Sequence, residues 1–350
     1  MSFTSHFKKI AEWIHPDNWI EIETIDAHTA GEPLRIILSG FPEVKGNSIL
    51  QKRKFIKENY DYLRTALMHE PRGHTDMYGC IITPPVSSDS DFGVIFMHNE
   101  GYSTMCGHGI IAVTKVVLET GMFEKIEPIT KIKIDSPAGI ITSFARINNG
   151  KIESIFFQNV PSFVLLKNQF VDVPDFGKIN FDIAFGGAFY AFVNADKIGL
   201  SLHQNNVKEL IEKGMMIKNA VMNNYEIKHP IDDELSFLYG TIFYGKPLSQ
   251  NVDIRNVCIF ADGEVDRSPT GTGVSAMAAI KYFNNEMKTN ESFITESIVG
   301  TKFTTKIIEQ KKFADFDAII PEVEGNAFIT GKNIFYIDPE DPLKNGFLIK

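Results

Sequence analysis

Two short stretches of the chain place a reactive side chain directly before a glycine-rich segment. The first, MCGHGIIAV, carries the thiol of Cys106, and the second, SPTGTGVSAM, carries the hydroxyl of Thr270. In both, a Gly-x-Gly pattern and an aliphatic residue follow, which is typical of the start of a buried helix. The free amides at a helix start carry partial positive charge and bind anions. We expect a thiol at such a position to have a pKa lowered from about 8.5 toward neutrality, so that it acts as a base or a nucleophile.

The two stretches belong to an internal sequence repeat. A shift of 164 residues aligns Cys106 with Thr270, and it also aligns both glycines, the next aliphatic residue and an alanine. The same shift aligns the pair Ile95–Phe96 with the pair Ile259–Phe260, each at the end of an apolar run. The repeated unit is a strand, a loop of roughly ten residues and a helix start. We therefore predict two pseudo-equivalent domains whose helix N-termini converge on a carboxylate.

The second copy of the repeat has a hydroxyl where the first has a thiol, and this difference limits the reactions that a cleft between the two domains can catalyse. A racemase needs an acid or base on each face of the stereocentre, and an alcohol is too weak an acid for that work without a strong base beside it. The nearest acidic residue to Thr270 is Asp266. One thiolate can still remove a proton from one face, and a leaving group on the adjacent carbon then gives elimination. Thr270 either donates a hydrogen bond to a departing hydroxyl or only fills space, and the sequence leaves both roles open.

The elements that must position these residues are mostly strands. β-branched and aliphatic segments separated by turn residues run along the whole length, which indicates an α/β or α+β protein. Helices are predicted at about 50–69, 107–120, 202–217 and 271–284. Residues 1–19 have apolar side chains at helical spacing and predict a short amphipathic helix. Cys80 and Cys258 lie in apolar strand-like runs, so we expect both to be small buried side chains.

Composition excludes several classes of protein. With 350 residues, 43% apolar and 23% charged, the chain has enough sequence for two globular domains. The net charge of −9 argues against nucleic acid or an anionic membrane as the main partner. Three cysteines without a C-x-x-C pair favour a reducing compartment, and no run reaches the ~20 apolar residues of a membrane span. We expect a cytoplasmic protein whose partner is a small amino or imino acid; a homodimer is compatible with the sequence.

At these motifs the chain resembles the proline racemase family. The first motif stands as residues 105–108 and the second as residues 266–273, with Thr270 where racemases and hydroxyproline epimerases have a second cysteine. The stretches DAHTAGEPLR, EPRGHTDMYG and PEVEGNAFITG extend the likeness over nearly all of the chain after about residue 20. The resemblance implies a fold like that of diaminopimelate epimerase, with two pseudo-symmetric domains, each a β-barrel-like sheet around a central helix, and the active site between them.

The resemblance also implies domain boundaries and residue roles. After an extension at 1–19, the domains are expected at 20–178 and 179–334, with about 335–350 returning to the first. Within the family, the threonine resembles the branch that dehydrates trans-3-hydroxy-L-proline to Δ1-pyrroline-2-carboxylate through an enamine, without a cofactor. In that scheme Cys106 takes the Cα proton, Thr270 occupies the second catalytic position and Asp266 pairs with the ring ammonium. The substrate carboxylate is then held by the amides of Gly107, His108, Gly271 and Thr272.

Other functions compete with this interpretation. The nearest is a proline racemase or 4-hydroxyproline 2-epimerase that works with Thr270, and a more remote one is a non-catalytic binding protein for proline-like ligands. A dinucleotide-binding fold needs its glycines in the tight first turn after a strand, whereas the glycines of this chain come roughly ten residues after their strands. A metal site is disfavoured because the ligand spacings match no recognised zinc pattern. The candidate ligands for zinc would be His28, His74, Asp76, His98, Cys106 and His108. We expect the stretches DAHTAGEP and PRGHTDM to shape the walls of the cleft, and the sequence leaves a chemical role open for His28, Glu32 and His74.

Overall fold

The computed structural model describes residues 12–349. Residues 12–19 form turns and irregular backbone, and the rest of the helix predicted for residues 1–19 lies outside the described residues. In the described part of the chain, no helix combines the length and the apolar character needed to cross a bilayer.

The first half of the chain builds a sheet from strands that lie next to one another in sequence order. Along it the pairings run antiparallel, parallel, antiparallel, parallel, antiparallel and antiparallel. In β6 buried and less buried positions alternate, the period-2 pattern of a strand with one face on the core. The strands are β1 (Ile20–Thr29), β2 (Glu32–Ser39), β3 (Tyr78–Thr83), β4 (Phe92–His98), β5 (Ile129–Ser136), β6 (Gly139–Asn148) and β7 (Lys151–Gln158).

The second half repeats that order of pairings strand for strand. The strands that repeat it are β9 (Gly177–Phe185), β10 (Phe189–Asn194), β11 (Leu238–Gly245), β12 (Ile254–Phe260), β14 (Ser292–Glu296), β15 (Lys302–Phe313) and β16 (Phe316–Gly325). The second half also has a short additional strand, β13 (Glu264–Asp266), which pairs antiparallel with β12. An eighth strand completes each half: β17 (Ala327–Ile337) pairs antiparallel with β1, and β8 (Phe163–Val173) pairs antiparallel with β9. β7 and β16 join the halves edge to edge. The predicted pseudo-symmetry is confirmed.

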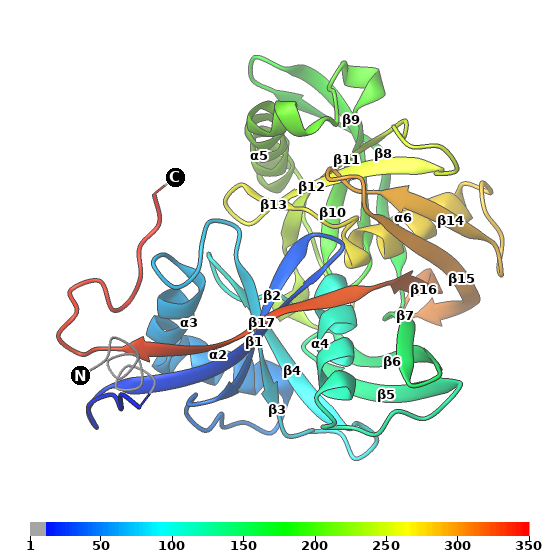
Figure 1. Cartoon of the computed structure of the whole chain (residues 1–350). Coiled ribbons are helices and arrows are strands. Elements are labelled where there is room, and N and C mark those ends of the chain that lie inside the picture. The colour runs from blue at the N-terminus through cyan, green and yellow to red at the C-terminus, as the bar shows by residue number, and fades with distance from the viewer. Residues whose placement is uncertain (1–11, 350) are drawn as a thin grey trace.

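Each half wraps its sheet around one central helix. These helices, α4 (Gly107–Glu119) and α6 (Gly271–Phe283), have 13 residues each and are related by the 164-residue shift at both ends. α4 packs against β1, β2, β6, β7 and β17, and α6 packs against the equivalent strands β9, β10, β15, β16 and β8. Figure 1 shows α4 in the lower half of the molecule and α6 in the upper half. Because both helices are apolar on nearly all sides, burial inside a curved sheet is the arrangement that covers them.

The remaining helices cross between strands at equivalent places in the two halves. The predicted helix at 50–69 is two helices, α2 (Ile49–Asn59) and α3 (Asp61–Met68), because the backbone of Tyr60 leaves the helical region with φ of −135°. Both lie between β2 and β3, as α5 (Val207–Asn224) lies between β10 and β11. α5 begins later and ends later than predicted, since its buried face continues to Val221. Short 3-10 helices span Asp196–Ile198 (η1), Gln204–Asn206 (η2) and Asp233–Leu235 (η3).

The strands near the middle and the end of the chain each pair with the first strand of one half. β8 pairs with β9, and β17, near the end of the chain, pairs with β1. Beyond β17, Phe347 forms an isolated bridge with Glu70. The predicted domain boundary at residue 178 stays a prediction.

Candidate active site

The N-termini of α4 and α6 meet at two glycines. A Cβ added to Gly107 would lie 2.5 Å from the Cα of Gly271, and one added to Gly271 would lie 2.6 Å from the Cα of Gly107. No side chain fits at either position, so only glycine allows the two helix starts to touch. The first amides of each helix have no intrahelical partner, and both helix dipoles direct positive charge into the same space.

A small cavity lined by buried residues lies beside this contact. Its volume of about 20 Å³ is enough for one water molecule. All seven predicted site residues line it: Cys106, Gly107, His108, Asp266, Thr270, Gly271 and Thr272. The remaining wall is formed by Tyr78, Met105, Tyr190, Tyr239, Cys258 and Phe260. The structure therefore brings the thiol and the hydroxyl of the two motifs into one enclosure.

Cys106 is the N-cap of α4. Its Sγ accepts a hydrogen bond from the Gly109 N–H at 3.2 Å and lies 3.3 Å from Nδ1 of His108. Burial raises the pKa of the Cys106 thiol well above its ordinary value, and the charges of Asp266 and Glu32 raise it further. The expected lowering of this pKa is wrong for this cavity. The Cys106 side chain is only 4% exposed, so a thiolate there would lose most of its hydration. The stabilisation that the Gly109 N–H and the helix N-terminus give to the thiolate is smaller than this loss.

His108 supplies a neutral hydrogen-bond acceptor for that thiol. Burial lowers the pKa of its ring to about 3, so the imidazole carries no charge at neutral pH. The ring also hydrogen-bonds the backbone of Pro33, and a neutral imidazole has one donor and one acceptor nitrogen. With its donor directed to Pro33, the acceptor is available to the hydrogen of Cys106. Thr29 Oγ1 donates to the His108 carbonyl at 2.8 Å and holds the helix start in place.

Thr270 has a strained backbone and a hydroxyl without a partner. Its φ of 62° lies in the left-handed region, which costs a β-branched residue about 1–3 kcal/mol. The side chain is buried, and Oγ1 makes no hydrogen bond to the described residues. It lies close enough to Asp266 and Cys258 to lower the pKa of both groups. Strain and an unpaired polar atom at one position are typical of functional sites.

Asp266 is held in the wall of the cavity without a neighbouring cation of its own. Its Oδ1 accepts from the Ser268 N–H at 2.7 Å, and burial raises the pKa of its carboxyl to about 6. Among residues 12–349 it forms no ion pair. The adjacent Arg267 turns away and lies 3.5 Å from Glu32 and 3.5 Å from Asp76. Asp266 is therefore available to an ammonium group that enters the cavity.

Cys258 and three tyrosines of the cavity wall were not predicted as site residues, whereas Glu32, named from the sequence, lies near the cavity without lining it. Glu32 is fully buried, accepts a hydrogen bond from the Arg267 N–H at 2.7 Å and leaves Oε1 without a partner in the described chain. Cys258 is buried as expected, but it also lines the cavity on the side of Thr270. Three tyrosines of the wall carry hydroxyl groups. Of these three, only Tyr78 had a signal in the sequence, because it lies within the motif EPRGHTDMYG.

The other candidate ligands do not join this site. His28 stacks on Phe328 and His74 hydrogen-bonds the carbonyl of Thr75, and neither lines the cavity. Within the described chain, no group of three His, Cys, Asp or Glu side chains is arranged to hold a metal ion.

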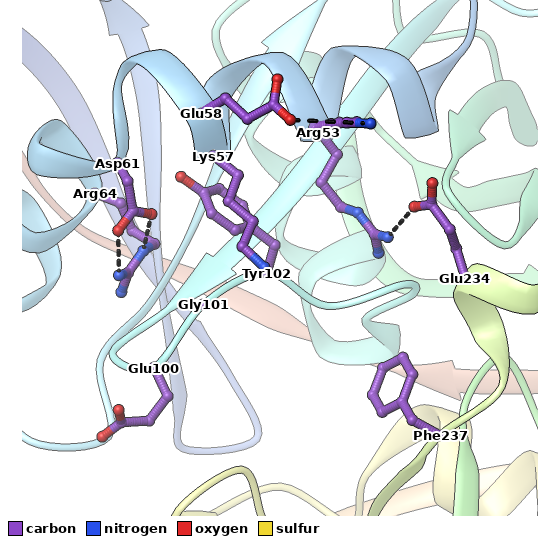
Figure 2. Close-up of a pocket in the computed structure, with 11 residues that line it drawn as sticks. Arg53, Lys57, Glu58, Asp61, Arg64, Glu100, Gly101, Tyr102, Glu234 and Phe237 are labelled. Atoms are coloured by element: carbon purple, nitrogen blue, oxygen red, sulfur yellow. Dashed lines mark hydrogen bonds and ion pairs between the residues drawn. The ribbon is translucent and has the colours of Figure 1, made fainter.

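A larger cavity of about 650 Å³ opens at the surface between α2, α3 and the segment that follows η3. Figure 2 shows Arg53 from α2 and Glu234 from η3 pointing toward one another across it, with Phe237 below. The described residues that line it include no thiol or histidine, and the charges there are mostly paired with one another. The ring of Phe237 lies 6.3 Å from that of Tyr239, which lines the inner cavity. We therefore regard the inner cavity as the reactive one and the larger as its neighbour toward solvent.

Comparison with known proteins adds independent observations. The family model described as proline racemase matches residues 24–348. The chain is 50% identical to a trans-3-hydroxy-L-proline dehydratase of Colwellia psychrerythraea, covering 98% of this chain and 97% of that one. It is 44% identical to a proline racemase of Clostridioides difficile, covering 94% and 98%. A solved hydroxyproline epimerase from Agrobacterium vitis, with bound trans-4-hydroxy-L-proline, superimposes with a TM-score of 0.90 at 29% identity, covering 95% and 96%.

Proposed function

This chain belongs to the proline racemase family, and we propose that it is a hydro-lyase that dehydrates trans-3-hydroxy-L-proline to Δ1-pyrroline-2-carboxylate. One observation carries the proposal: a single thiol and a single threonine hydroxyl stand at the equivalent helix starts of one cavity. A racemase needs two groups that exchange protons with carbon, whereas a dehydratase needs one such base.

The roles follow from the position of each group. The amides at the starts of α4 and α6 hold the substrate carboxylate and stabilise the negative charge that spreads into it when the Cα proton leaves. Asp266 pairs with the ring ammonium, whose positive charge offsets the carboxylates that disfavour the thiolate of Cys106. His108 accepts a hydrogen bond from the thiol of Cys106. The thiol releases its proton to solvent water before the cavity closes on the substrate.

The chemical sequence is short. The thiolate of Cys106 takes the Cα proton, and the electron pair of that bond forms a Cα–C3 double bond as the C3 hydroxyl leaves. The product is an enamine, which becomes the imine when a proton moves from nitrogen to C3. No step needs a cofactor. A cytoplasmic location and a homodimer stay predictions.

A racemase or epimerase is the second candidate. It is favoured by the 44% identity to a proline racemase and by Cys258, a second thiol in the wall on the side of Thr270. Proton NMR in deuterium oxide separates the two, with proline and hydroxyproline stereoisomers as substrates. Dehydration removes the C3 proton pattern of trans-3-hydroxy-L-proline and forms an imine. Epimerisation leaves the ring hydroxyl in place while deuterium enters at Cα, and that result with no imine would replace our proposal.

A further inference from the structure

The stereochemistry of the proposed substrate decides which wall of the cavity meets the leaving group, and this inference rests on the proposed function. In the trans isomer of an L-proline, the carboxylate and the 3-hydroxyl lie on opposite faces of the ring. The Cα hydrogen is opposite the carboxylate, so it shares a face with the hydroxyl. A base that takes the Cα hydrogen therefore has the departing hydroxyl on its own side. Thr270, at the other helix start, faces the wrong side of the ring to give it a proton.

Hydroxide is a poor leaving group, so its departure needs a proton donor on the face of Cys106. Tyr78 of β3 is the hydroxyl-bearing residue that packs there. Its ring lies edge-on to the ring of His108, with centroids 4.8 Å apart, and His108 in turn lies 3.3 Å from the Cys106 sulfur. Tyr78 is 3% exposed and lines the cavity.

The hydroxyl of Tyr78 is fixed by two further hydroxyls. It lies 2.6 Å from Ser103 Oγ, to which it donates, and 3.3 Å from the hydroxyl of Tyr239. Such a chain keeps the oxygen in position while its hydrogen turns toward a new acceptor. Burial raises the pKa of Tyr78 well above its ordinary value, so the phenol keeps its proton at neutral pH, the form that a donor requires.

The other polar groups of the cavity have different partners. The imidazole of His108 is engaged by Pro33 and by the thiol of Cys106. Asp266 is assigned to the ring ammonium. The hydroxyl of Tyr190 lies 2.6 Å from Thr272 Oγ1, at the start of α6. Among the tyrosines that line the cavity, Tyr78 is the one whose ring contacts His108, the residue beside the Cys106 sulfur.

We propose that Tyr78 is the catalytic acid that protonates the C3 hydroxyl as it leaves. The C3–O bond breaks, its electron pair stays on oxygen, and the Tyr78 proton converts the hydroxyl to water. The phenolate then takes the proton that Cys106 removed from Cα. Both side chains return to their starting state, and the overall change is loss of one water molecule.

The test uses Tyr78→Phe and two substrates that differ only in the leaving group. Fluoride leaves with far less help from an acid than hydroxide does. With trans-3-hydroxy-L-proline, we expect kcat to fall by about 10²- to 10⁴-fold. With trans-3-fluoro-L-proline, we expect fluoride release within a few-fold of wild type. Retained fluoride release also shows that the variant folds and that Cys106 still removes the Cα proton.

Tyr190→Phe is the matched control because it removes a hydroxyl from the other side of the same cavity. It is expected to change both rates by the same factor, so that their ratio stays at the wild-type value. Equal losses on both substrates in Tyr78→Phe would show a structural role and overturn the proposal. An unchanged rate of water loss would overturn it as well and would leave the Cys106 thiol as the donor. If the wild-type enzyme itself forms no imine from trans-3-hydroxy-L-proline, the proposed function fails first.

Discussion

Cys106, His108 and Asp266 are each at least nine-tenths buried, and burial shifts the pKa of each toward its uncharged form. The cavity therefore holds a thiol, a neutral imidazole and a carboxyl that is close to half-protonated at pH 6. A zwitterionic substrate brings an ammonium and a carboxylate into this space. We infer that the substrate's own charges, together with the two helix starts, prepare the thiolate.

Replacing Cys106 by serine separates its chemical role from its structural one. Sγ accepts the N-cap hydrogen bond from Gly109, and serine is a preferred N-cap residue. We expect Cys106→Ser to keep the wild-type Tm, measured by circular dichroism. Imine formation should fall by at least about 10²- to 10⁴-fold, because an alcohol is a much weaker acid than a thiol. Activity near the wild-type level in this variant would remove Cys106 as the base.

The carboxyl of Asp266 should control activity at low pH. With its pKa raised to about 6, it is charged above that pH and neutral below it. A neutral carboxyl pairs poorly with the ring ammonium, so kcat/KM of the wild type should fall as the pH drops through about 6. In Asp266→Asn we expect kcat/KM to be lower at pH 8 and to lack this limb of the profile. A limb that persists near pH 6 in the variant would assign it to another group.

The same shift predicts the effect of Asp266 on stability. The unfolded carboxyl has a pKa of about 3.9, below the folded value of about 6, so the folded state binds more protons between these values. Stability from this group is present below about pH 4 and is lost as the pH rises through 6, by about 3 kcal/mol at most. Asp266→Asn lacks that loss. The free energy of unfolding in urea, measured at pH 5 and at pH 8, should therefore rise in the variant relative to the wild type as the pH increases.

The contact between α4 and α6 depends on two residues without side chains. A methyl group at Gly107 would lie 2.5 Å from the Cα of Gly271 and 3.1 Å from Cζ of Phe157, so the helix starts must move apart. We expect Gly107→Ala to cost about 1–3 kcal/mol in urea unfolding. It should also raise KM, since the four amides no longer converge on one carboxylate. Gly101→Ala is the control, because its added Cβ meets nothing within 4 Å; equal effects in both variants would contradict the prediction.

How far the sequence predicts these elements depends on the range of the interactions that form them. α4 and α6 follow from a local pattern of glycines and aliphatic residues, and the bounds at Gly107 and Gly271 are found as expected. The break at Tyr60 has no comparable local signal, since no glycine or proline marks it. Tyr78 and Tyr239 are 161 residues apart in the sequence and belong to different halves. Their contact forms only when the two halves pack together, so no local sequence pattern predicts it. The predicted direction of the Cys106 pKa shift was wrong for the same reason, because the burial that raises this pKa depends on the whole fold.

At the scale of the molecule, the two halves close over the cavity through contacts that cross between them. Arg267 reaches Glu32, and His98 lies 3.0 Å from Glu264 with both side chains buried. Tyr78 meets Tyr239 in the same region. A cavity that holds about one water molecule cannot admit a substituted pyrrolidine ring. Substrate entry therefore requires the cavity to enlarge. We infer that the halves separate on the side of the larger cavity, because Phe237 in its wall contacts Tyr239 in the wall of the inner cavity.

The ion pair between Arg53 and Glu234 is the contact that spans this larger cavity, with 2.8 Å between Nη2 and Oε2 (Figure 2). Glu234 is 52% exposed, so the pair is worth about 0.2–1 kcal/mol at low salt and less when salt screens it. Glu234→Gln should therefore increase opening by up to about fivefold. The readout is the rate at which iodoacetamide alkylates Cys106, mapped by mass spectrometry, because this thiol is buried until the halves separate.

The matched control is Glu58→Gln, whose partner Lys54 lies on the same helix and whose loss leaves the halves joined as before. It should alkylate at the wild-type rate. At about 1 M salt, where the Debye length is about 3 Å, Glu234→Gln and the wild type should become equal. Equal rates at low salt would show that the Arg53–Glu234 pair does not hold the halves together. The closed state would then depend on the other contacts between the halves, such as Arg267–Glu32 and His98–Glu264.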